Sequence, residues 1–166
     1  IRLSLVGSEM CIRDRAQGEV PEEEYTVPLG EAAIVKEGTD VTVVAMSLIV
    51  YEALAAAEEA EKEGISVELI DPRTLVPLDV KAIRKSVAKT GRIVVVDEAC
   101  QTCSAACEIL SIVVEDDDTF SRLKAPAKRV CGLDVPVPFS PPMEKYSIPD
   151  KDKILSAIRQ VIRYNK

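Results

Sequence analysis

The chain of 166 residues contains no histidine and no tryptophan, and aromatic residues make up only 4% of it. Histidine is the commonest general base, the usual activator of a nucleophile and a frequent zinc ligand, so most of that chemistry is missing from this chain. The phosphate-binding glycine patterns G-x-G-x-x-G and G-x-x-x-x-G-K-[ST] are also absent. We therefore expect no independent dinucleotide or nucleoside triphosphate site.

Long apolar runs and basic clusters are missing as well. No apolar stretch approaches the roughly 20 residues of a membrane span, and the formal net charge is −7. An acidic chain with few aromatics is poorly suited to nucleic acid, but it suits a basic protein partner through electrostatic steering. Since no secretory signal is evident, we expect a bacterial cytoplasmic location, without membrane or nucleic-acid partners.

The first fifteen residues do not fit the rest of the chain. Leu5 to Asp14 can be back-translated into a string that resembles a common transposase sequencing adapter. We predict that residues 1–15 are a translated adapter; the competing interpretation is a short strand or the end of a targeting peptide. Without them about 150 residues remain, which suits one domain, and the net charge becomes −8.

Strand and helix signals alternate along the remaining chain. Five segments rich in β-branched residues predict strands, and the first two are expected to pair as a hairpin through the turn Lys36–Asp40. The continuous run at Ile93 is typical of a strand buried on both faces of a parallel sheet. The predicted strands are Ala32–Val35, Val41–Met46, Val67–Ile70, Ile93–Val96 and Ala127–Cys131.

Four helices are predicted between or after these strands. Ser47 should cap the first helix and Gly64 should end it, and Asp79 and Gly91 should do the same for the second. Helical spacing of apolar residues marks the face that should pack on the sheet. The stripes are Val50, Ala53, Leu54 and Ala57; Val80, Ile83 and Val87; Ile109, Ile112 and Val113 in Ser104–Val114; and Ile154, Ile158, Val161 and Ile162 in Asp152–Arg163.

This alternation predicts an α/β fold, a three-layer α/β/α sandwich with a mostly parallel sheet of about five strands. The segment Val135–Pro142 carries four prolines in eight residues, so it cannot be a central strand. We expect it to run extended across the surface before Pro149 introduces the last helix. The acidic run Glu115–Asp118 is interpreted as a solvated loop, with contact to a basic partner as the alternative.

Polar residues stand at the carboxyl ends of the predicted strands, where open α/β sheets bind ligands. An arginine among carboxylates could clamp an anion or substrate, or it could form a local ion pair that orders the turns. We favour the ion pair, because only carboxylates accompany the arginine as groups with a tunable pKa. The candidate interface residues at these strand ends are Ser47, Asp71, Arg73, Asp97, Glu98 and Asp134.

Adjacent carboxylates on one of these strands argue against acid–base catalysis. Asp97 and Glu98 should point to opposite faces of the sheet, whereas paired-carboxylate mechanisms need both groups around one bond. One carboxylate is expected to cap the following loop and the other to meet a neighbour. We predict no catalytic, cofactor-binding or metal-binding residue in this chain.

Four cysteines follow the predicted adapter: Cys100, Cys103, Cys107 and Cys131. A C-x-x-C pair near the start of a helix can have a lowered thiol pKa, and three thiolates could hold zinc or an iron–sulfur cluster. A fourth ligand would have to be Cys131, since no histidine is present. The alternative, which we favour, is that these are small cysteines packed against the sheet.

The run Asp71-Pro72-Arg73-Thr74-Leu75-Val76-Pro77-Leu78-Asp79 resembles the D-x-R-T-L-x-P-L-D signature of the transketolase-like C-terminal domain. The form found here is similar to the β subunit of the decarboxylating component of 2-oxo acid dehydrogenase complexes. Weaker resemblances occur in the family's order, from about Glu19 to the last helix. They are Val27–Ala32, Glu37–Thr42, Thr90–Arg92, Val95–Ala99, Leu123–Pro126, Val135–Pro142 and Ile148-Pro149.

The resemblance implies a role within a larger enzyme. In that family, a thiamine diphosphate- and magnesium-dependent heterotetramer decarboxylates pyruvate, a branched-chain 2-oxo acid or acetoin, and passes the acyl group to a lipoyl-bearing acyltransferase. The β subunit's N-terminal domain supplies the activating glutamate, so the cofactor would bind outside this chain. The C-terminal domain contacts the α subunit and a second β subunit, and it helps to bind the small basic domain of the acyltransferase.

The resulting division of the chain is an adapter at 1–15, a linker from an N-terminal pyrimidine-binding domain at 16–30, and the transketolase-like C-terminal domain at 31–166. We expect the isolated chain to be inactive and to serve subunit assembly and acyltransferase docking. Two alternatives stay open. One is the corresponding domain of another thiamine enzyme, of the transketolase or deoxyxylulose-phosphate synthase type, and the other is a cysteine-based redox or metal module.

Overall fold

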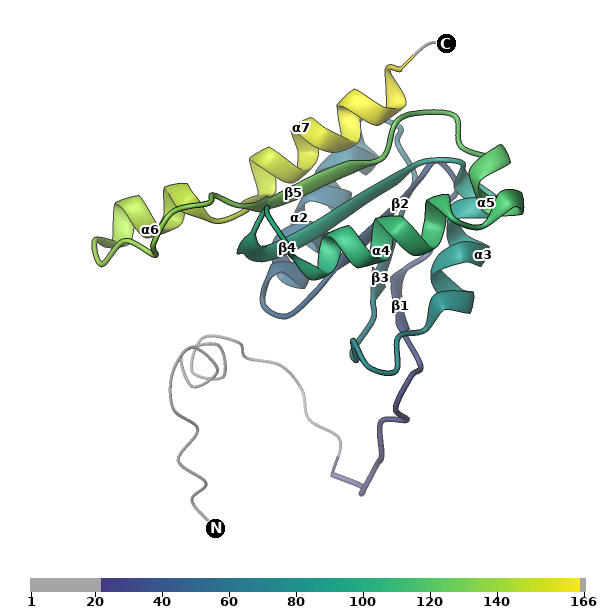
Figure 1. The fold of residues 1–166 in the computed structure, drawn as a ribbon, viewed down its shortest axis with the longest axis horizontal. Helices are drawn as coiled ribbons and strands as arrows, with labels where there is room; N and C mark the ends of the chain where they lie inside the picture. Colours follow the sequence, from purple (N-terminus) through teal and green to yellow (C-terminus); the bar gives the residue numbers. More distant parts are fainter. Residues whose placement is uncertain (1–21, 165–166) are drawn as a thin grey trace.

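A five-stranded sheet in the order β1-β3-β2-β4-β5 forms the middle layer of the protein (Figure 1). In the computed structural model, residues 22–164 are described; the predicted adapter and the start of the predicted linker lie outside them. Strands β2 to β5 run parallel to one another, and β1 is antiparallel to β3. The strands are β1 (Ala33–Lys36), β2 (Val41–Ala45), β3 (Val67–Asp71), β4 (Ile93–Cys100) and β5 (Lys128–Gly132).

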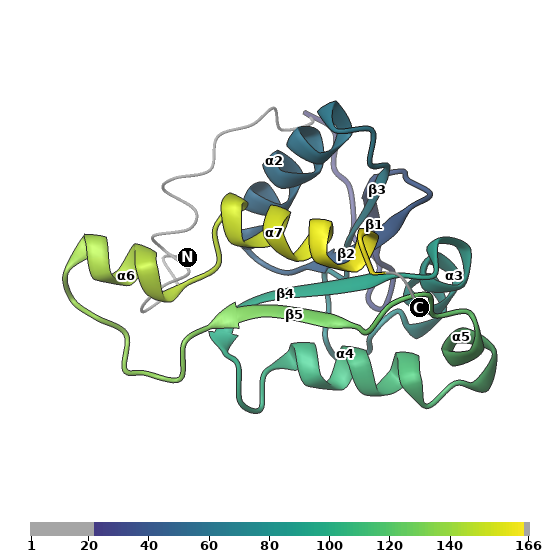
Figure 2. The ribbon, with the colours of Figure 1, turned by 90° about the horizontal axis from the view of Figure 1, so that it is seen from above.

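Helices cover both faces of this sheet, which confirms the predicted three-layer α/β/α architecture. Helices α2 and α7 lie side by side on one face, and α3, α4 and α5 cover the other (Figure 2). Both layers are needed because the parallel strands present apolar side chains to each side. The helices are α2 (Ile49–Lys62), α3 (Val80–Thr90), α4 (Ala105–Val114), α5 (Asp117–Ser121), α6 (Pro141–Ser147) and α7 (Lys151–Ile162).

Alternate residues of the strands supply two separate apolar cores. Val43 and Leu69 face the layer of α2 and α7, where they meet Ile158 and its neighbours. Val44 and Val95 face the opposite layer, where they meet Ile83 of α3 and Ile109 of α4. The predicted stripes therefore mostly face the sheet, although Val50, Leu54, Val80, Ile112 and Ile162 are only partly buried, and Val80 is in neither core.

The predicted hairpin between the first two strands is wrong. β1 pairs with β3, with Ala33 opposite Asp71, while β2 lies between β3 and β4. β1 has exposed apolar residues and so suits an edge, whereas every residue of β2 is buried. The connection between them passes close to β3 at Gly38, where an added Cβ would lie 2.2 Å from the carbonyl carbon of Val67.

The predicted helix ends hold at α3 but not at the start of α2. Asp79 caps α3 by accepting a hydrogen bond from the Ala82 amide, and Gly91 ends that helix with a left-handed φ of 75°. Gly64 likewise has a φ of 77° just after α2. Ser47 is not the cap of α2: it has a φ of 58°, and its backbone oxygen rather than its hydroxyl accepts from Val50.

Two short helices were not predicted. The acidic run forms part of α5, because Asp116 accepts hydrogen bonds from the amide and hydroxyl of Thr119 and so caps a helical turn. The proline-rich stretch is irregular only as far as Ser140, after which α6 begins. Pro141 and Pro142 occupy the first positions of α6, where a missing N–H costs nothing.

The signature loop, Asp71–Asp79, holds the segment that precedes β1, residues 22–32, which we call the lead-in. The Thr74 hydroxyl accepts from the Gly30 amide at 3.0 Å and donates to the Pro77 oxygen at 2.7 Å. Asp79, while capping α3 through one oxygen, accepts from the Ala32 amide at 3.0 Å through the other. The signature thus joins the lead-in, the end of β3 and the start of α3.

The buried polar groups between the sheet and α3 have hydrogen-bond or ion-pair partners. Glu68 is 2% exposed, pairs with Lys89 and accepts from the Gly38 amide at 3.3 Å. Burial opposes its ionisation, but hydrogen bonds from Lys89, Ser86 and Gly38 outweigh burial and hold the pKa of Glu68 below its ordinary value. The hydroxyl of Thr42 contacts those of Ser86 and Thr90 at 2.6 and 2.9 Å.

Replacing Glu68 should destabilise the fold in a pH-dependent way. Glu68→Gln should lower the free energy of unfolding by about 1–3 kcal/mol at neutral pH, because it removes a charged partner of Lys89 inside the protein. The stability that ionised Glu68 contributes is present above the ordinary glutamate pKa. It is lost as the pH falls through the lower pKa of Glu68 in the folded protein. Urea unfolding should therefore show the gap between the two proteins narrowing in acid.

The exposed pair of Glu59 and Lys62 provides the matched control. Glu59→Gln should change stability little, because solvent-exposed ion pairs contribute little. An effect of Glu68→Gln no larger than that of Glu59→Gln would contradict the importance assigned to the buried carboxylate.

Candidate functional site

The carboxyl ends of the parallel strands bring three predicted carboxylates to one edge of the sheet, where each bonds to a nearby loop. Asp71 accepts a hydrogen bond from the Arg73 amide at 2.9 Å, and Asp97 accepts from the Ala99 amide at 3.0 Å. Asp134 accepts from the amide of Thr102 at 3.0 Å and from its hydroxyl at 2.8 Å. Asp71 and Asp97 thus order their own loops, whereas Asp134, after β5, orders the loop after β4.

The other predicted edge residues are open to solvent. Ser47, Arg73 and Glu98 are exposed, and the first two have a φ of 58°. Among residues 22–164, the ion pairs do not include Arg73, so its backbone amide rather than its guanidinium connects it to Asp71. Asp97 is buried while Glu98 is exposed, in line with their expected opposite orientation.

The loop after β4 is fastened to β5 at close range. The pairing of the two strands shifts register between Asp97 and Cys100, and the Gln101 amide donates to the Gly132 oxygen at 3.0 Å. A Cβ on Gly132 would lie 2.6 Å from the Glu98 oxygen, so glycine permits this approach. Hydrogen bonds from the backbone and then the side chain of Thr102 hold the pKa of Asp134 below its ordinary value.

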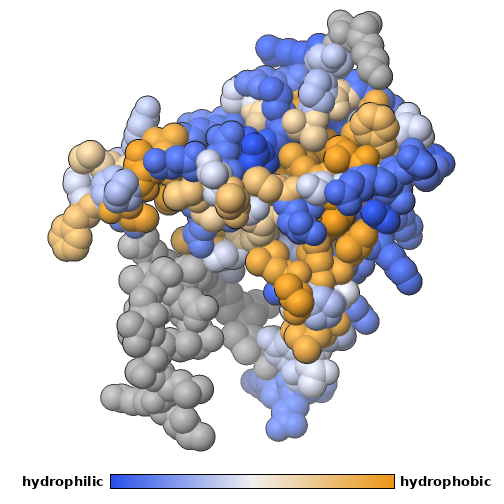
Figure 3. Space-filling view, in the orientation of Figure 1, coloured by the Kyte–Doolittle hydropathy of each residue, from blue (hydrophilic) through white to orange (hydrophobic). Residues whose placement is uncertain are grey.

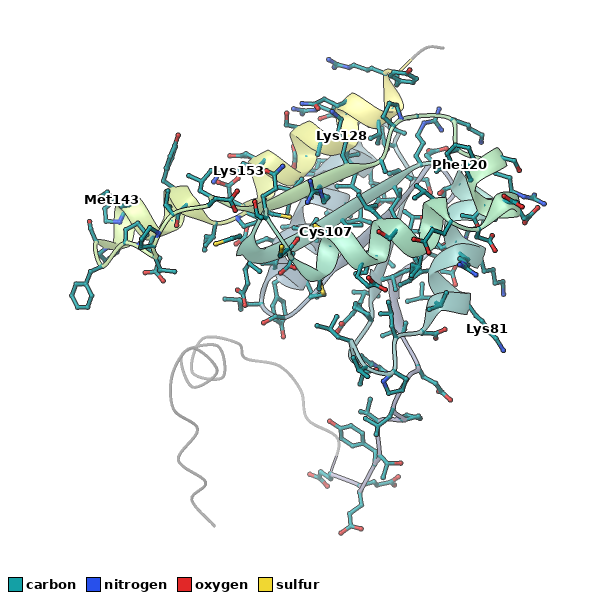
Figure 4. All side chains as sticks on the ribbon, in the orientation of Figure 1. Lys81, Cys107, Phe120, Lys128, Met143 and Lys153 are labelled. Carbon is teal, nitrogen blue, oxygen red and sulfur yellow. The ribbon has the colours of Figure 1, made fainter. Side chains whose placement is uncertain are left out.

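Two cysteines lie beside an arginine at the start of α4, and we call Cys107, Cys131, Ser104 and Arg129 the thiol cluster. Nη1 of Arg129 lies 2.8 Å from the Cys107 sulfur. The Ser104 hydroxyl lies 3.8 Å from the Cys107 sulfur and 3.7 Å from the Cys131 sulfur. Figure 4 shows Cys107 on the first turn of α4, close to the end of β4.

The two thiols of the cluster differ in their chemistry. The Ser104 hydrogen bond and then the charge of Arg129 lower the pKa of the Cys107 thiol, whereas burial raises the pKa of Cys131. All four cysteines that follow the predicted adapter are unpaired thiols, and Cys100 and Cys103 are exposed. Within the described residues, no group of three or more carboxylates and thiols is placed to hold a metal ion.

Sequence reasoning did not identify Arg129 or Thr102 as members of this edge. Arg129 stands two positions before Cys131 in β5, and residues at that spacing share a face of a strand. The alternation of side chains along a strand could therefore have predicted that the Arg129 guanidinium lies on the same face as Cys131. Thr102 gave no such signal, because its partner Asp134 is 32 residues away in the chain.

An apolar arm, residues 133–147, projects beyond the sheet and ends in α6 (Figures 1 and 2). Phe139 is fully exposed, and Val137 and Tyr146 are 75% and 72% exposed. The arm contains a groove lined by Leu133, Val135, Pro136, Val137, Pro138, Pro142, Met143, Tyr146 and Ser147. Figure 3 shows further apolar surface over the loop after β3, where Leu75 and Val76 are exposed.

The architecture and its edge define a class of α/β domain. It is a mostly parallel sheet between two helical layers, with a signature loop that fastens the segment ahead of the first strand. The chain belongs to the family described as "Transketolase, C-terminal domain", whose model matches residues 30–154.

Curated relatives extend this similarity over nearly the whole chain. One is the β subunit of acetoin:2,6-dichlorophenolindophenol oxidoreductase from Cupriavidus necator, 45% identical over 150 residues, which are 90% of this chain and 44% of that protein. Another is the 2-oxoisovalerate dehydrogenase β subunit from Bacillus subtilis, 40% identical over 149 residues, covering 89% and 45%. The chain therefore spans less than half the length of these relatives.

A solved structure shares the fold. It is described as "Split gene transketolase, inactive beta4 tetramer", with a TM-score of 0.74 and 23% identity, and the match covers 90% of this chain and 47% of that chain. In the described part of the protein, no helix has the length and apolarity needed to cross a bilayer.

The three carboxylate-bearing turns at this edge do not fit the diphosphate of thiamine diphosphate. Backbone N–H groups are the usual phosphate ligands at such an edge, and here those of Arg73, Ala99 and Thr102 already donate to carboxylates. The same carboxylates would repel a phosphate group. No chemical step is therefore assigned to that cofactor at this edge.

Removing the Asp134 carboxylate should release the loop that follows β4 and carries Cys103. Asp134→Ala should accelerate hydrogen exchange of the Thr102 amide several-fold while leaving global unfolding nearly unchanged, because only a local opening becomes easier. In the unmodified chain, acidification through the lowered pKa of Asp134 should produce the same local effect. The exposed Asp152→Ala variant is the control, and unchanged exchange at Thr102 in Asp134→Ala would contradict the assignment.

Proposed function

We propose that this chain is the C-terminal domain of the β subunit of a thiamine-dependent dehydrogenase acting on a 2-oxo acid or acetoin. The parent enzyme would decarboxylate its substrate oxidatively and pass the acyl group to a lipoyl group on an acyltransferase. The observation that carries the proposal is 40–45% identity to such β subunits over about nine tenths of the chain. The thiamine site would lie in parts of the enzyme outside these residues.

Within that enzyme, the domain would serve assembly and docking. The apolar arm supports this role, because contiguous exposed apolar surface on a folded domain marks a protein-contact site. The arm would contact the α subunit or a second β subunit. The net charge of −7 suits the small basic domain of the acyltransferase, which would be attracted over a distance set by ionic screening.

A domain exchange tests the proposal directly. Residues Gly30–Lys166 would replace the matching segment of the Cupriavidus necator β subunit, and the chimera would be coexpressed with its α subunit. We expect copurification, thiamine diphosphate binding by calorimetry, and acetoin-dependent reduction of 2,6-dichlorophenolindophenol. Activity should fall within about 100-fold of the parent, since a misplacement of roughly 1 Å costs on that order.

The 166-residue chain alone is the matched control for that experiment. It should neither bind thiamine diphosphate nor turn over acetoin or pyruvate. A folded chimera that fails to copurify with the α subunit would overturn the assembly role. Clear cofactor binding by the chain alone would overturn the division of labour between the domains.

The isolated chain should associate through its arm. Sedimentation velocity should show a concentration-dependent shift toward dimers or tetramers, because Phe139 and Tyr146 leave apolar area uncovered. The double variant Phe139→Ser/Tyr146→Ser should remain monomeric over the same range. Phe120→Ser is the control, since Phe120 is also exposed but lies on α5, at the other end of the protein from the arm (Figure 4).

A monomer at high concentration in the unmodified chain would contradict the arm as a contact surface. So would equal loss of association in Phe120→Ser, which would show that exposed apolar area in general, and not the arm, drives it.

A further inference from the structure

The thiol cluster places a cation directly against one sulfur. Nη1 of Arg129 lies 2.8 Å from the Cys107 sulfur and also 2.8 Å from the Gln101 oxygen, so one nitrogen contacts both groups. A positive charge at this distance favours the thiolate, which is the nucleophilic form of cysteine. Cys107 is partly exposed.

A second thiol shares a contact with the first through one serine hydroxyl. The Ser104 hydroxyl, on a residue only 7% exposed, contacts both the Cys107 and the Cys131 sulfurs. The separation of the two sulfurs therefore cannot exceed the sum of those two contacts. The charged groups acting on this pair are Arg129, which favours the thiolate, and Asp97 beside Cys131, which disfavours it.

Burial adds an asymmetry between the two thiols. Cys131 sits in β5 next to buried Gly132, and burial raises the pKa of its thiol, whereas the Arg129 guanidinium lies against the Cys107 sulfur. One thiol is thus suited to attack an oxidant, and the other is suited to react afterwards. Such a pair is the arrangement found in redox-sensitive proteins, where a reactive thiol has a resolving thiol beside it.

We propose that Cys107 and Cys131 form a peroxide-sensitive thiol pair, with Cys107 as the attacking and Cys131 as the resolving residue. The Cys107 thiolate attacks one oxygen of hydrogen peroxide, the O–O bond breaks, and after protonation water leaves and a sulfenic acid remains. The Cys131 thiol then attacks the Cys107 sulfur, and its proton leaves with the hydroxyl as a second water. Both cysteines are oxidised by one electron each, and one peroxide is reduced to two waters.

The disulfide would tie the first turn of α4 to the end of β5, the strand that leads into the apolar arm. The Ser104 hydroxyl has to leave the space between the sulfurs before they bond. Because the reacting groups belong to neither the sheet-edge carboxylates nor the arm, this reactivity is independent of the proposed dehydrogenase role.

The test uses the 166-residue chain with Cys11→Ser, Cys100→Ser and Cys103→Ser, so that only the pair remains. Hydrogen peroxide should produce a loss of two hydrogen atoms in the intact mass and a Cys107–Cys131 crosslink in a non-reducing peptide map. Adding Cys131→Ser should stop the reaction at a Cys107 sulfenic acid that dimedone traps. A Cys107 that oxidises further while Cys131 stays reduced would overturn the pairing.

The role of Arg129 is tested by rate. Arg129→Met should slow oxidation of Cys107 about fivefold or more, because the charge that favours the thiolate is gone, and Arg129→Lys should restore most of the rate. Lys128→Met is the matched control: it removes an exposed neighbouring charge and should leave the rate unchanged. Equal rates in Arg129→Met and Lys128→Met would overturn the assignment.

One measurement requires no substitution. In the unmodified folded chain, site-resolved labelling with iodoacetamide at neutral pH should modify Cys107 faster than the more exposed Cys103, although exposure alone predicts the reverse order. Labelling of Cys103 first would overturn the proposal even if the arginine variants fail to fold.

Discussion

The complete burial of β2 is the constraint on which the rest of the fold depends. All five of its residues are inaccessible, and parallel neighbours occupy both of its edges. Apolar side chains on both faces need a helical layer on each side, which α2 and α7 supply on one and α3 and α4 on the other. The one polar side chain of β2, Thr42, is accommodated because Ser86 and Thr90 of α3 meet it.

Local sequence patterns predicted the structural features that depend on residues close together in the chain. Segments rich in β-branched residues identified the parallel strands, and helical spacing with Asp79 and Gly91 identified α3 and its ends. The partner of β1 could not be predicted in this way, because Ala33 pairs with Asp71 after a long stretch of intervening chain. Helix α6 was missed because Val135–Pro142 was expected to run extended, although proline is compatible with the first turn of a helix.

At the sheet edge, the sequence predicted positions better than it predicted interactions. Asp71, Asp97 and Asp134 do stand at strand ends, but each carboxylate is satisfied by backbone amides whose location depends on loop conformation. The Arg129 contact to Cys107 depends on how β5 packs against the start of α4. Residue type and spacing constrain such contacts only weakly, whereas the strand register and the loop geometry determine them.

The bonds from Thr74 and Asp79 to the lead-in affect how force would enter this domain. Tension applied ahead of Gly30 would be borne first by the Gly30 and Ala32 amides, and through them by the end of β3 and the first turn of α3. It would bypass the weakly buried edge strand β1, which could otherwise peel away one residue at a time. A pull on the chain ahead of Gly30 would accordingly displace β3 and α3 together.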